Sequence, residues 1–211
     1  MGKKPFRLCS DYEDEVTGAE ANLWRLPDCT EISGEICRIN TDFRAGIAYA
    51  QAAMAGKQIS QAALLALFFP DGAPGDRDAA VRAVNDFFSA GQQASRGEGE
   101  KRAPLISYSV DAEVISAEFQ RVYQIDLSTA EMHWWRFLAL LRGLISHSFS
   151  ERVRYRAANP NDIKDKNMRS QWQRLKRAYA LDEHGQSAYE QEPKTLEELN
   201  AMLLAQARGE R

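Results

Sequence analysis

The chain has 211 residues, of which 27 are basic and 30 acidic, so its formal net charge at pH 7 is only −3. The electrostatic field of a protein with so small a net charge favours neither nucleic acid nor a strongly charged surface as the class of partner. Hydrophobic residues make up 44% and charged residues 27% of the chain, an ordinary globular composition that can form a core without covalent staples.

The cysteines and the N-terminus indicate where the protein works. Cys9, Cys29 and Cys37 are odd in number and form no CxxC pair, which favours free thiols in a reducing compartment. No apolar run follows Lys3 and Lys4, as a signal peptide would require. No stretch reaches the roughly 18 apolar residues of a membrane span. We therefore expect an intracellular protein with no membrane partner.

The first part of the chain divides into an arm and a hairpin followed by helices. Residues 1–22 are polar and rich in acids, which predicts a flexible arm. The segment 23–90 opens differently, because Ile32 and Ile36 lie in short alternating patterns on either side of Gly34. This pattern predicts a short β-hairpin with a glycine turn.

Helices are predicted next, because the apolar period changes to 3.6 residues. The first covers about 43–54. The second begins at Ser60 and ends before Pro70, since serine caps helix N-termini and proline stops a helix. The third covers 76–90. Residues 91–107 combine glycine, serine and charges without an apolar period, which predicts a linker or loop.

Residues 108–181 carry the strongest helix signals and are expected to form a helical part with an aromatic cluster, followed by a tail with one short helix in 182–211. Three sites fit the capping box, in which serine or threonine is followed three residues later by glutamate: Ser128 with Glu131, Ser148 with Glu151, and Thr195 with Glu198. Helical spacing places Trp135 and Trp172 in the core. The predicted fold class is mainly α, a multi-helix bundle with a short N-terminal β-hairpin.

No residues in the sequence match a common catalytic or cofactor motif. Phosphate-binding loops, dinucleotide loops, HExxH and GxSxG are missing. His133 and His147 would lie about 21 Å apart along a straight helix, too far to share a metal. Asp162 and Asp165 lie beside lysines, which favours a charged turn over an acid/base pair. We expect no catalytic residue, no metal and no cofactor.

The first candidate binding feature is an aromatic cluster that contains His133, Trp134, Trp135 and Phe137. Successive helical residues point about 100° apart, so the two tryptophans cannot face the same spot. Both can belong to the core. Alternatively, Trp134 or Phe137 borders a groove that receives an apolar helix, with His133 beside it.

The second candidate feature is a basic stretch in 152–177, where nine basic residues face two acidic ones. It can be a solvated face, a docking face for an acidic partner, or a contact for phosphates, although no nucleic-acid-binding motif accompanies it. The basic residues predicted to contact a partner are Arg152, Arg156, Arg169, Arg174 and Lys176.

The segment YQIDLSTAEMHWWRFLALLRGL (123–144), preceded by DAEVISAEF, resembles the signature of the phage "gene product fifteen" family. The opening LPDCTEISGEICRINTDFR and the basic stretch that ends in RLKRAYAL extend this resemblance over about 24–181. Gln124 is a departure, because it stands where the family usually has glycine.

The resemblance implies a gene between those for the major tail protein and the tape-measure protein of a long-tailed phage or prophage. It implies a non-enzymatic tail-assembly chaperone that acts in the bacterial host cytoplasm. The expected partners are the tape-measure protein and, secondarily, the tail-tube protein, with homo-oligomerisation left open. The alternatives are a minor structural protein of the virion and a nucleic-acid-binding module that uses 152–177.

Overall fold

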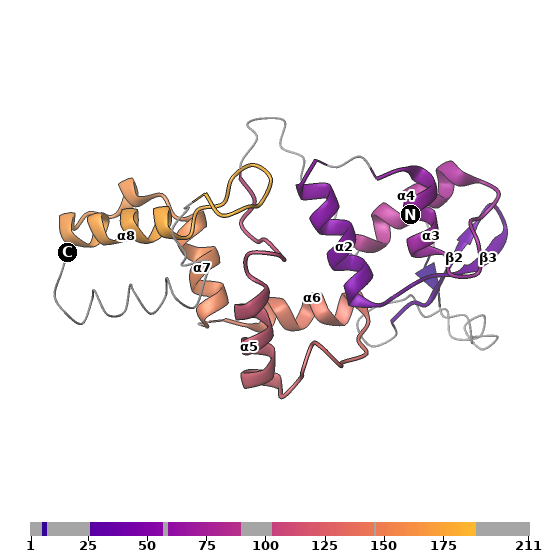
Figure 1. The fold of residues 1–211 in the computed structure, drawn as a ribbon, viewed down its shortest axis with the longest axis horizontal. Helices are drawn as coiled ribbons and strands as arrows, with labels where there is room; N and C mark the ends of the chain where they lie inside the picture. Colours follow the sequence, from indigo (N-terminus) through magenta and orange to yellow (C-terminus); the bar gives the residue numbers. More distant parts are fainter. Residues whose placement is uncertain (1–5, 8–25, 57–58, 90–102, 146, 189–211) are drawn as a thin grey trace, which may run out of the picture.

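The computed structural model of the chain describes residues 6–7, 26–56, 59–89, 103–145 and 147–188. Within these ranges a three-stranded antiparallel sheet precedes seven α-helices, which confirms the predicted helical fold with an N-terminal hairpin (Figure 1). The strands are β1 (Phe6–Arg7), β2 (Cys29–Ile32) and β3 (Glu35–Arg38). The helices are α2 (Phe43–Met54), α3 (Gln61–Phe68), α4 (Arg77–Phe88), α5 (Ala112–Tyr123), α6 (Trp134–Gly143), α7 (Ser148–Ala157) and α8 (Lys166–Ala178), with one 3-10 turn, η1 (Pro160–Asp162).

The hairpin of β2 and β3 turns at two residues that both have left-handed backbones. The φ angles are 49° at Ser33 and 87° at Gly34, as a two-residue turn between twisted strands requires. Strand β1 pairs with the other edge of β2, with Phe6 opposite Thr30. It lies inside the predicted flexible arm 1–22, whose other residues fall outside the described ranges.

Local capping signals identified some helix starts correctly and others wrongly. Ser60 caps α3 as predicted, because its side chain accepts a hydrogen bond from the amide of Ala63 at 3.2 Å. The box predicted at Ser128 is wrong: that serine instead bonds Asp126, and α6 begins only at Trp134. The box predicted at Ser148 is displaced by one residue, because His147 and Ser150 make it. The Thr195–Glu198 box lies outside the described residues.

The core is one continuous cluster of apolar side chains that joins the sheet to α2–α6 and to Phe149 of α7. Its largest fully buried members are the phenylalanines Phe68, Phe87, Phe119 and Phe137. Burying one such ring stabilises a fold by roughly 1.5–3 kcal/mol, so these rings provide much of the driving force. Helix α8, in contrast, has no buried residue.

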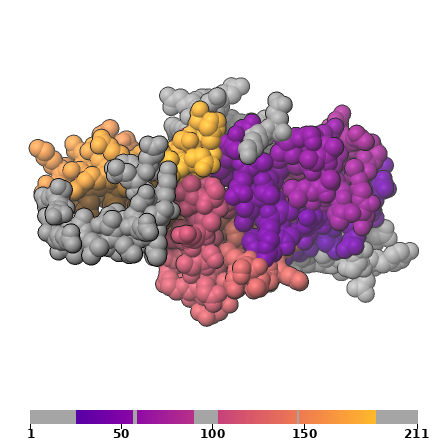
Figure 2. All heavy atoms as spheres, viewed as in Figure 1, coloured from indigo at the N-terminus to yellow at the C-terminus, as the bar shows by residue number. Residues whose placement is uncertain are grey.

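The elements follow one another along an elongated molecule. The sheet, α3 and α4 lie at one end, α5 and α6 in the middle, and α8 at the other end (Figure 1). Helix α8 packs mainly on α7 and η1. In the space-filling view α8, in orange, lies far from the N-terminal helices (Figure 2). We call the sheet with α2–α6 the body, and residues 148–178 the α7–α8 hairpin.

Candidate partner-binding surface

The two adjacent tryptophans of the signature segment both lie in the core. Trp134 is 3% exposed and its Nε1 donates a hydrogen bond to the carbonyl of Phe88 at 3.0 Å. Trp135 is 9% exposed and its Nε1 donates to the carbonyl of Phe87 at 2.8 Å. The rings leave α6 in different directions, yet both indoles are held by the last turn of α4. The core position predicted for Trp135 is confirmed.

Helix α2 covers the other side of the same cluster. The ring of Phe137 is fully buried, stacked on Phe43 at 5.0 Å and on Phe119 at 5.3 Å between centroids. Trp134 lies so close to α2 that a Cβ on Gly46 would be 2.3 Å from its ring. Trp134 and Phe137 are thus both buried in this structure, and their contact with a partner stays a prediction.

His133 also has a structural role that its position in the sequence did not reveal. Its Nδ1 accepts a hydrogen bond from the amide of Trp135 at 3.0 Å, which caps α6, and its Nε2 donates to the carbonyl of Pro27 at 2.8 Å. The first bond requires an unprotonated Nδ1, whereas Nε2–H can donate to the Pro27 carbonyl in the neutral and in the charged ring. Burial lowers the pKa of His133, although the Pro27 carbonyl and the charge of Asp28 oppose this. A partner contact at His133 would break one of these bonds.

The loop before α6 is fixed by Arg44, a residue that sequence reasoning did not single out. Its guanidinium donates hydrogen bonds to the carbonyls of Leu127, Ser128 and Ala130, at 3.0 to 3.1 Å. Next to it, Asp42 forms an isolated antiparallel bridge with His133. The DFR motif and the MHWW motif are therefore parts of one structural contact between α2 and α6.

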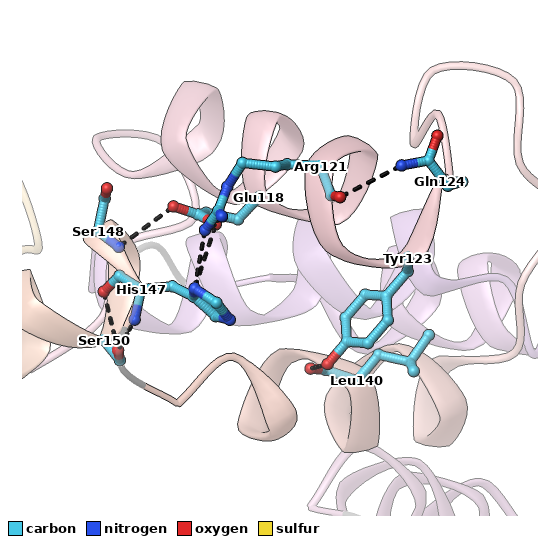
Figure 3. Close-up of polar contacts among 8 residues, drawn as sticks. All are labelled: Glu118, Arg121, Tyr123, Gln124, Leu140, His147, Ser148 and Ser150. Atoms are coloured by element: carbon cyan, nitrogen blue, oxygen red, sulfur yellow. Dashed lines mark hydrogen bonds and ion pairs between the residues drawn. The ribbon is translucent and has the colours of Figure 1, made fainter.

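A polar cluster ties α5 to α6 and α7 (Figure 3). Glu118 accepts hydrogen bonds from Arg121 and, at 3.1 Å, from the backbone amide of Ser148 at the start of α7. Arg121 also donates to Nδ1 of His147 at 2.7 Å. Burial acts to raise the pKa of Glu118, but the bonds from Arg121 and Ser148 and the arginine charge outweigh it, so that pKa lies below its usual value. The hydroxyl of Tyr123 completes the link by donating to the carbonyl of Leu140 at 2.9 Å.

A second buried polar contact anchors the α7–α8 hairpin to the body. Asp111 is fully buried and receives both terminal nitrogens of Arg156, at 2.6 and 2.8 Å. The same guanidinium donates to the carbonyls of Leu105 at 3.0 Å and Tyr179 at 2.6 Å. The amide of Ser107 donates to Asp111 at 3.0 Å. Arg156, which was predicted to contact a partner, is therefore committed inside the protein.

Several other members of the basic stretch also contact their own chain. Arg152 approaches Asp111 at 3.6 Å and lies over the ring of Tyr179. Arg169 donates to the carbonyl of Ile163 at 2.9 Å and Lys176 to that of Ala158 at 2.5 Å. Of the five basic residues predicted as partner contacts, Arg174 is exposed at the surface. The exposed cations Lys164, Lys166 and Arg177 accompany it.

Helix α8 presents the apolar face that these contacts leave open. Met168 is 53% exposed, and Trp172 and Leu175, one and two turns further on, are half-buried. Trp172 rests edge-on against Tyr155 and beneath the guanidinium of Arg154. The predicted core position of Trp172 is therefore wrong, because its ring is only half-buried and α8 has no buried residue. Among the described residues, the ring contacts given above come from α7.

A shallow hollow of about 360 Å³ lies beside the C-terminal half of α2. Its lining is largely made of small or polar residues: Ala48, Gln51, Ala52, Met54, Ala55, Ser107, Ser109, His184 and Gln186. The ring of His184 lies 3.5 Å from Glu183, and the hydroxyls of Ser107 and Ser109 bond each other at 3.0 Å.

Among the described residues, no three histidine, cysteine or acidic side chains gather closely enough to hold a metal ion. No described helix has both the length and the apolar composition that a membrane crossing needs. The surface of α8 is thus the clearest candidate for an interaction in the part of the chain that the structure describes.

A buried aromatic signature, internally paired cations and one amphipathic surface helix define a helical protein with a protruding C-terminal hairpin. The sequence model described as Bacteriophage Gp15 protein matches residues 24–181, well over half of the chain. The protein therefore belongs to the bacteriophage Gp15 family. No curated protein and no solved structure gives a significant match.

Proposed function

We propose that this phage protein is a tail-assembly chaperone that binds the tape-measure protein in the cytoplasm of the bacterial host. A tape-measure protein is a very long helical chain with apolar stripes, which would aggregate if nothing covered them before the tail tube forms. A small helical protein covers such a stripe and leaves when tail-tube subunits replace it. Membership of the bacteriophage Gp15 family supports this role.

The observation that carries the proposal is the exposed face of α8. Five of its 13 residues are basic and none is acidic, while Met168 and the outer edge of Trp172 remain accessible. An amphipathic helix with acidic residues beside its apolar stripe complements this surface in shape and charge. The sequence alone placed the contact on one face of 132–145, where Trp134, Trp135 and Phe137 are buried.

The expected affinity at each contact is modest. Met168 and one edge of an indole offer little apolar area, and the cations of α8 are solvated, so they increase the association rate and specificity more than the affinity. Many copies bound along one long chain would still keep it soluble, because the contacts act together. Weak individual contacts also permit release during tube assembly.

Co-expression with the tape-measure protein tests the proposal with matched variants. Met168→Glu places a charge on the proposed surface. Ile36→Glu is the matched control, because it places the same charge on an apolar side chain of β3 that is 61% exposed. Wild type and Ile36→Glu should raise the soluble yield of the tape-measure protein, whereas Met168→Glu should not. Equal yields with and without the wild-type protein would remove the chaperone role.

Two measurements separate the chaperone from the alternatives. Mass spectrometry of purified virions should not detect the protein, because a chaperone leaves before the particle matures, whereas a minor structural subunit stays. A nucleic-acid-binding module would shift DNA or RNA in a gel with an affinity that falls steeply with salt. The internal bonds of Arg152, Arg156, Arg169 and Lys176 reduce the number of cations free for such contacts.

A further inference from the structure

We infer that two copies of this protein associate through the outer edge of β3, as antiparallel strands related by a two-fold axis at Cys37. The residues that carry the inference lie in the β2–β3 hairpin, at the opposite end of the molecule from α8 (Figure 1). The association needs neither the tape-measure protein nor the surface of α8, so it goes beyond the proposed function.

The outer edge of β3 is open in the part of the chain that the structure describes. The sheet order is β1-β2-β3, so β3 pairs with β2 on one side only. Ile32 and Glu35 flank the two-residue turn and form a pair that exchanges both backbone hydrogen bonds. Since bonded and non-bonded pairs alternate along the strands, Ile36 and Arg38 direct their N–H and C=O groups away from β2. No described residue bonds these outward groups.

The outward groups determine the register of a symmetric pair. A two-fold axis between antiparallel strands places one residue opposite its own copy. With Cys37 on the axis, Ile36 of each copy faces Arg38 of the other, and every outward N–H and C=O of β3 finds a partner. With Ile36 on the axis, Arg38 would face Gly34, whose left-handed backbone belongs to the turn. The register centred on Cys37 therefore forms more hydrogen bonds.

The side chains in this register are compatible as well. Ile36 is 61% exposed, and the aliphatic stem of Arg38 from the second copy would cover it. Glu31 lies opposite Ile36 on β2. A row of side chains across the joined sheet would thus run from Glu31 through Ile36 to Arg38 of the second copy. The charges at the two ends of this row attract each other, and the symmetry forms the row twice.

A second copy fits the edge of β3 better than it fits α8. Helix α8 carries five basic residues and no acidic one, so two α8 surfaces repel each other. The contact along β3 is short, which predicts a reversible dimer at the low end of interface sizes. Because α8 lies at the far end of each copy, both α8 surfaces remain exposed in this dimer (Figure 1). The pairing also protects the open edge of each copy from other strands.

Sedimentation equilibrium of the full-length protein tests the dimer with a matched pair of variants. Ile36→Lys places a cation opposite Arg38 of the second copy, and Ile36→Glu places an anion there. The dissociation constant of the dimer should rise at least about threefold in Ile36→Lys and should not rise in Ile36→Glu. Within one chain the charges act with the opposite sign, because residue 36 faces Glu31. Damage to the hairpin therefore cannot produce this result.

Oxidation with diamide tests the register. In a Cys9→Ser background the remaining thiols are Cys37 and the buried Cys29. With Cys37 on the axis, its Cα atom and that of the second copy would lie about 4.5 Å apart, within the range that a disulfide spans. Diamide takes up the two hydrogens as the disulfide forms. Peptide mass spectrometry should find Cys37 linked to Cys37, and this link should form more slowly in Ile36→Lys.

Three results would overturn the inference. The first is a wild-type protein that stays monomeric at every concentration. The second is an equal rise of the dissociation constant in Ile36→Lys and Ile36→Glu, which would mean that residue 36 faces its own copy. The third is a dimer in which Cys37 does not link to Cys37. The proposed function fails separately: Met168→Glu changes α8 alone, so its dimer should match that of wild type whatever its effect on the tape-measure protein.

Discussion

The body and the α7–α8 hairpin use aromatic and charged residues in opposite ways. In the body, Trp134 and Phe137 are buried and the indole nitrogen is bonded to a backbone carbonyl. In the α7–α8 hairpin, the side chain of Trp172 is only half-buried and that of Met168 is exposed. The MHWW motif, by which the family is most easily recognised, thus builds the buried scaffold. The exposed apolar surface lies on α8, whose sequence contains no such motif.

The largest expected difference between the two regions is the cost of removing one aromatic ring from each. Phe137→Ala should lower the free energy of unfolding by about 3–5 kcal/mol, because it leaves a cavity between Phe43 and Phe119. Trp172→Ala should cost only about 1–2 kcal/mol, since its ring is half-solvated in the folded state. Urea unfolding measures both. Similar losses would mean that the hairpin is as tightly packed as the body.

The next expected effect concerns the anchor between the two regions. Asp111→Asn should cost about 3–4 kcal/mol, because it leaves the buried guanidinium of Arg156 without its counter-charge. Glu151→Gln is the control, since it removes the partner of an exposed arginine on the same helix and should cost below about 0.5 kcal/mol. Chemical unfolding again gives both values. A loss near zero for Asp111→Asn would show that the hairpin needs no anchor.

The features that the sequence predicted correctly depend only on residues that are neighbours in the chain. The hairpin turn at Gly34 and the cap at Ser60 require only local geometry, and the structure confirms both. The box at Ser128 satisfied the local rule but failed, because His133 is held by Asp42 from a distant part of the chain and sets the start of α6. No local rule contains that information.

The candidate site was harder to predict because amphipathic spacing does not say what covers a face. The stripe through Met168 and Trp172 gave the correct side of α8, but not that α7 covers only part of it. Likewise, a run of basic residues in the sequence shows where positive charge lies, but not which groups of the folded chain each residue binds. Asp111 lies 45 residues before Arg156 in the sequence, and nothing local links them. The open face of α8 could therefore be found only after the contacts of the other cations were known.

A smaller effect should appear as a pH dependence of the body through His133. Burial lowers the pKa of this ring in the folded protein, so its stabilising contribution is complete above the unfolded pKa, about 6.5. That contribution is lost as the pH falls through the lower, folded-state pKa, because the cap bond needs an unprotonated Nδ1. The free energy of unfolding of wild type should therefore decline between pH 7.5 and pH 5.

His133→Asn isolates this contribution, because asparagine still accepts the cap bond but does not titrate in this range. At pH 7.5 its stability should lie within about 1 kcal/mol of wild type. Its decline towards pH 5 should be smaller than that of wild type. Glu118 adds little to the decline in this range, because its pKa is lowered from an ordinary value of 4.5 and its contribution is lost only at lower pH. Identical pH profiles of wild type and His133→Asn would show that the His133 ring does not titrate differently in the folded state.

The smallest expected effect is a gain in stability at Gln124, the last residue before the loop that Arg44 holds. Gln124 ends α5 with φ of 57° and ψ of 32°, a left-handed backbone that disfavours residues with a Cβ. The resemblance places glycine here in the family, and glycine adopts this conformation without a steric penalty. Gln124→Gly should therefore raise the free energy of unfolding by about 0.5–1 kcal/mol, even though glycine gains entropy in the unfolded chain. Gln120→Gly, one turn earlier within α5, should lower the free energy of unfolding by about 1 kcal/mol. Changes of opposite sign from the same substitution would identify backbone strain at Gln124 as the cause.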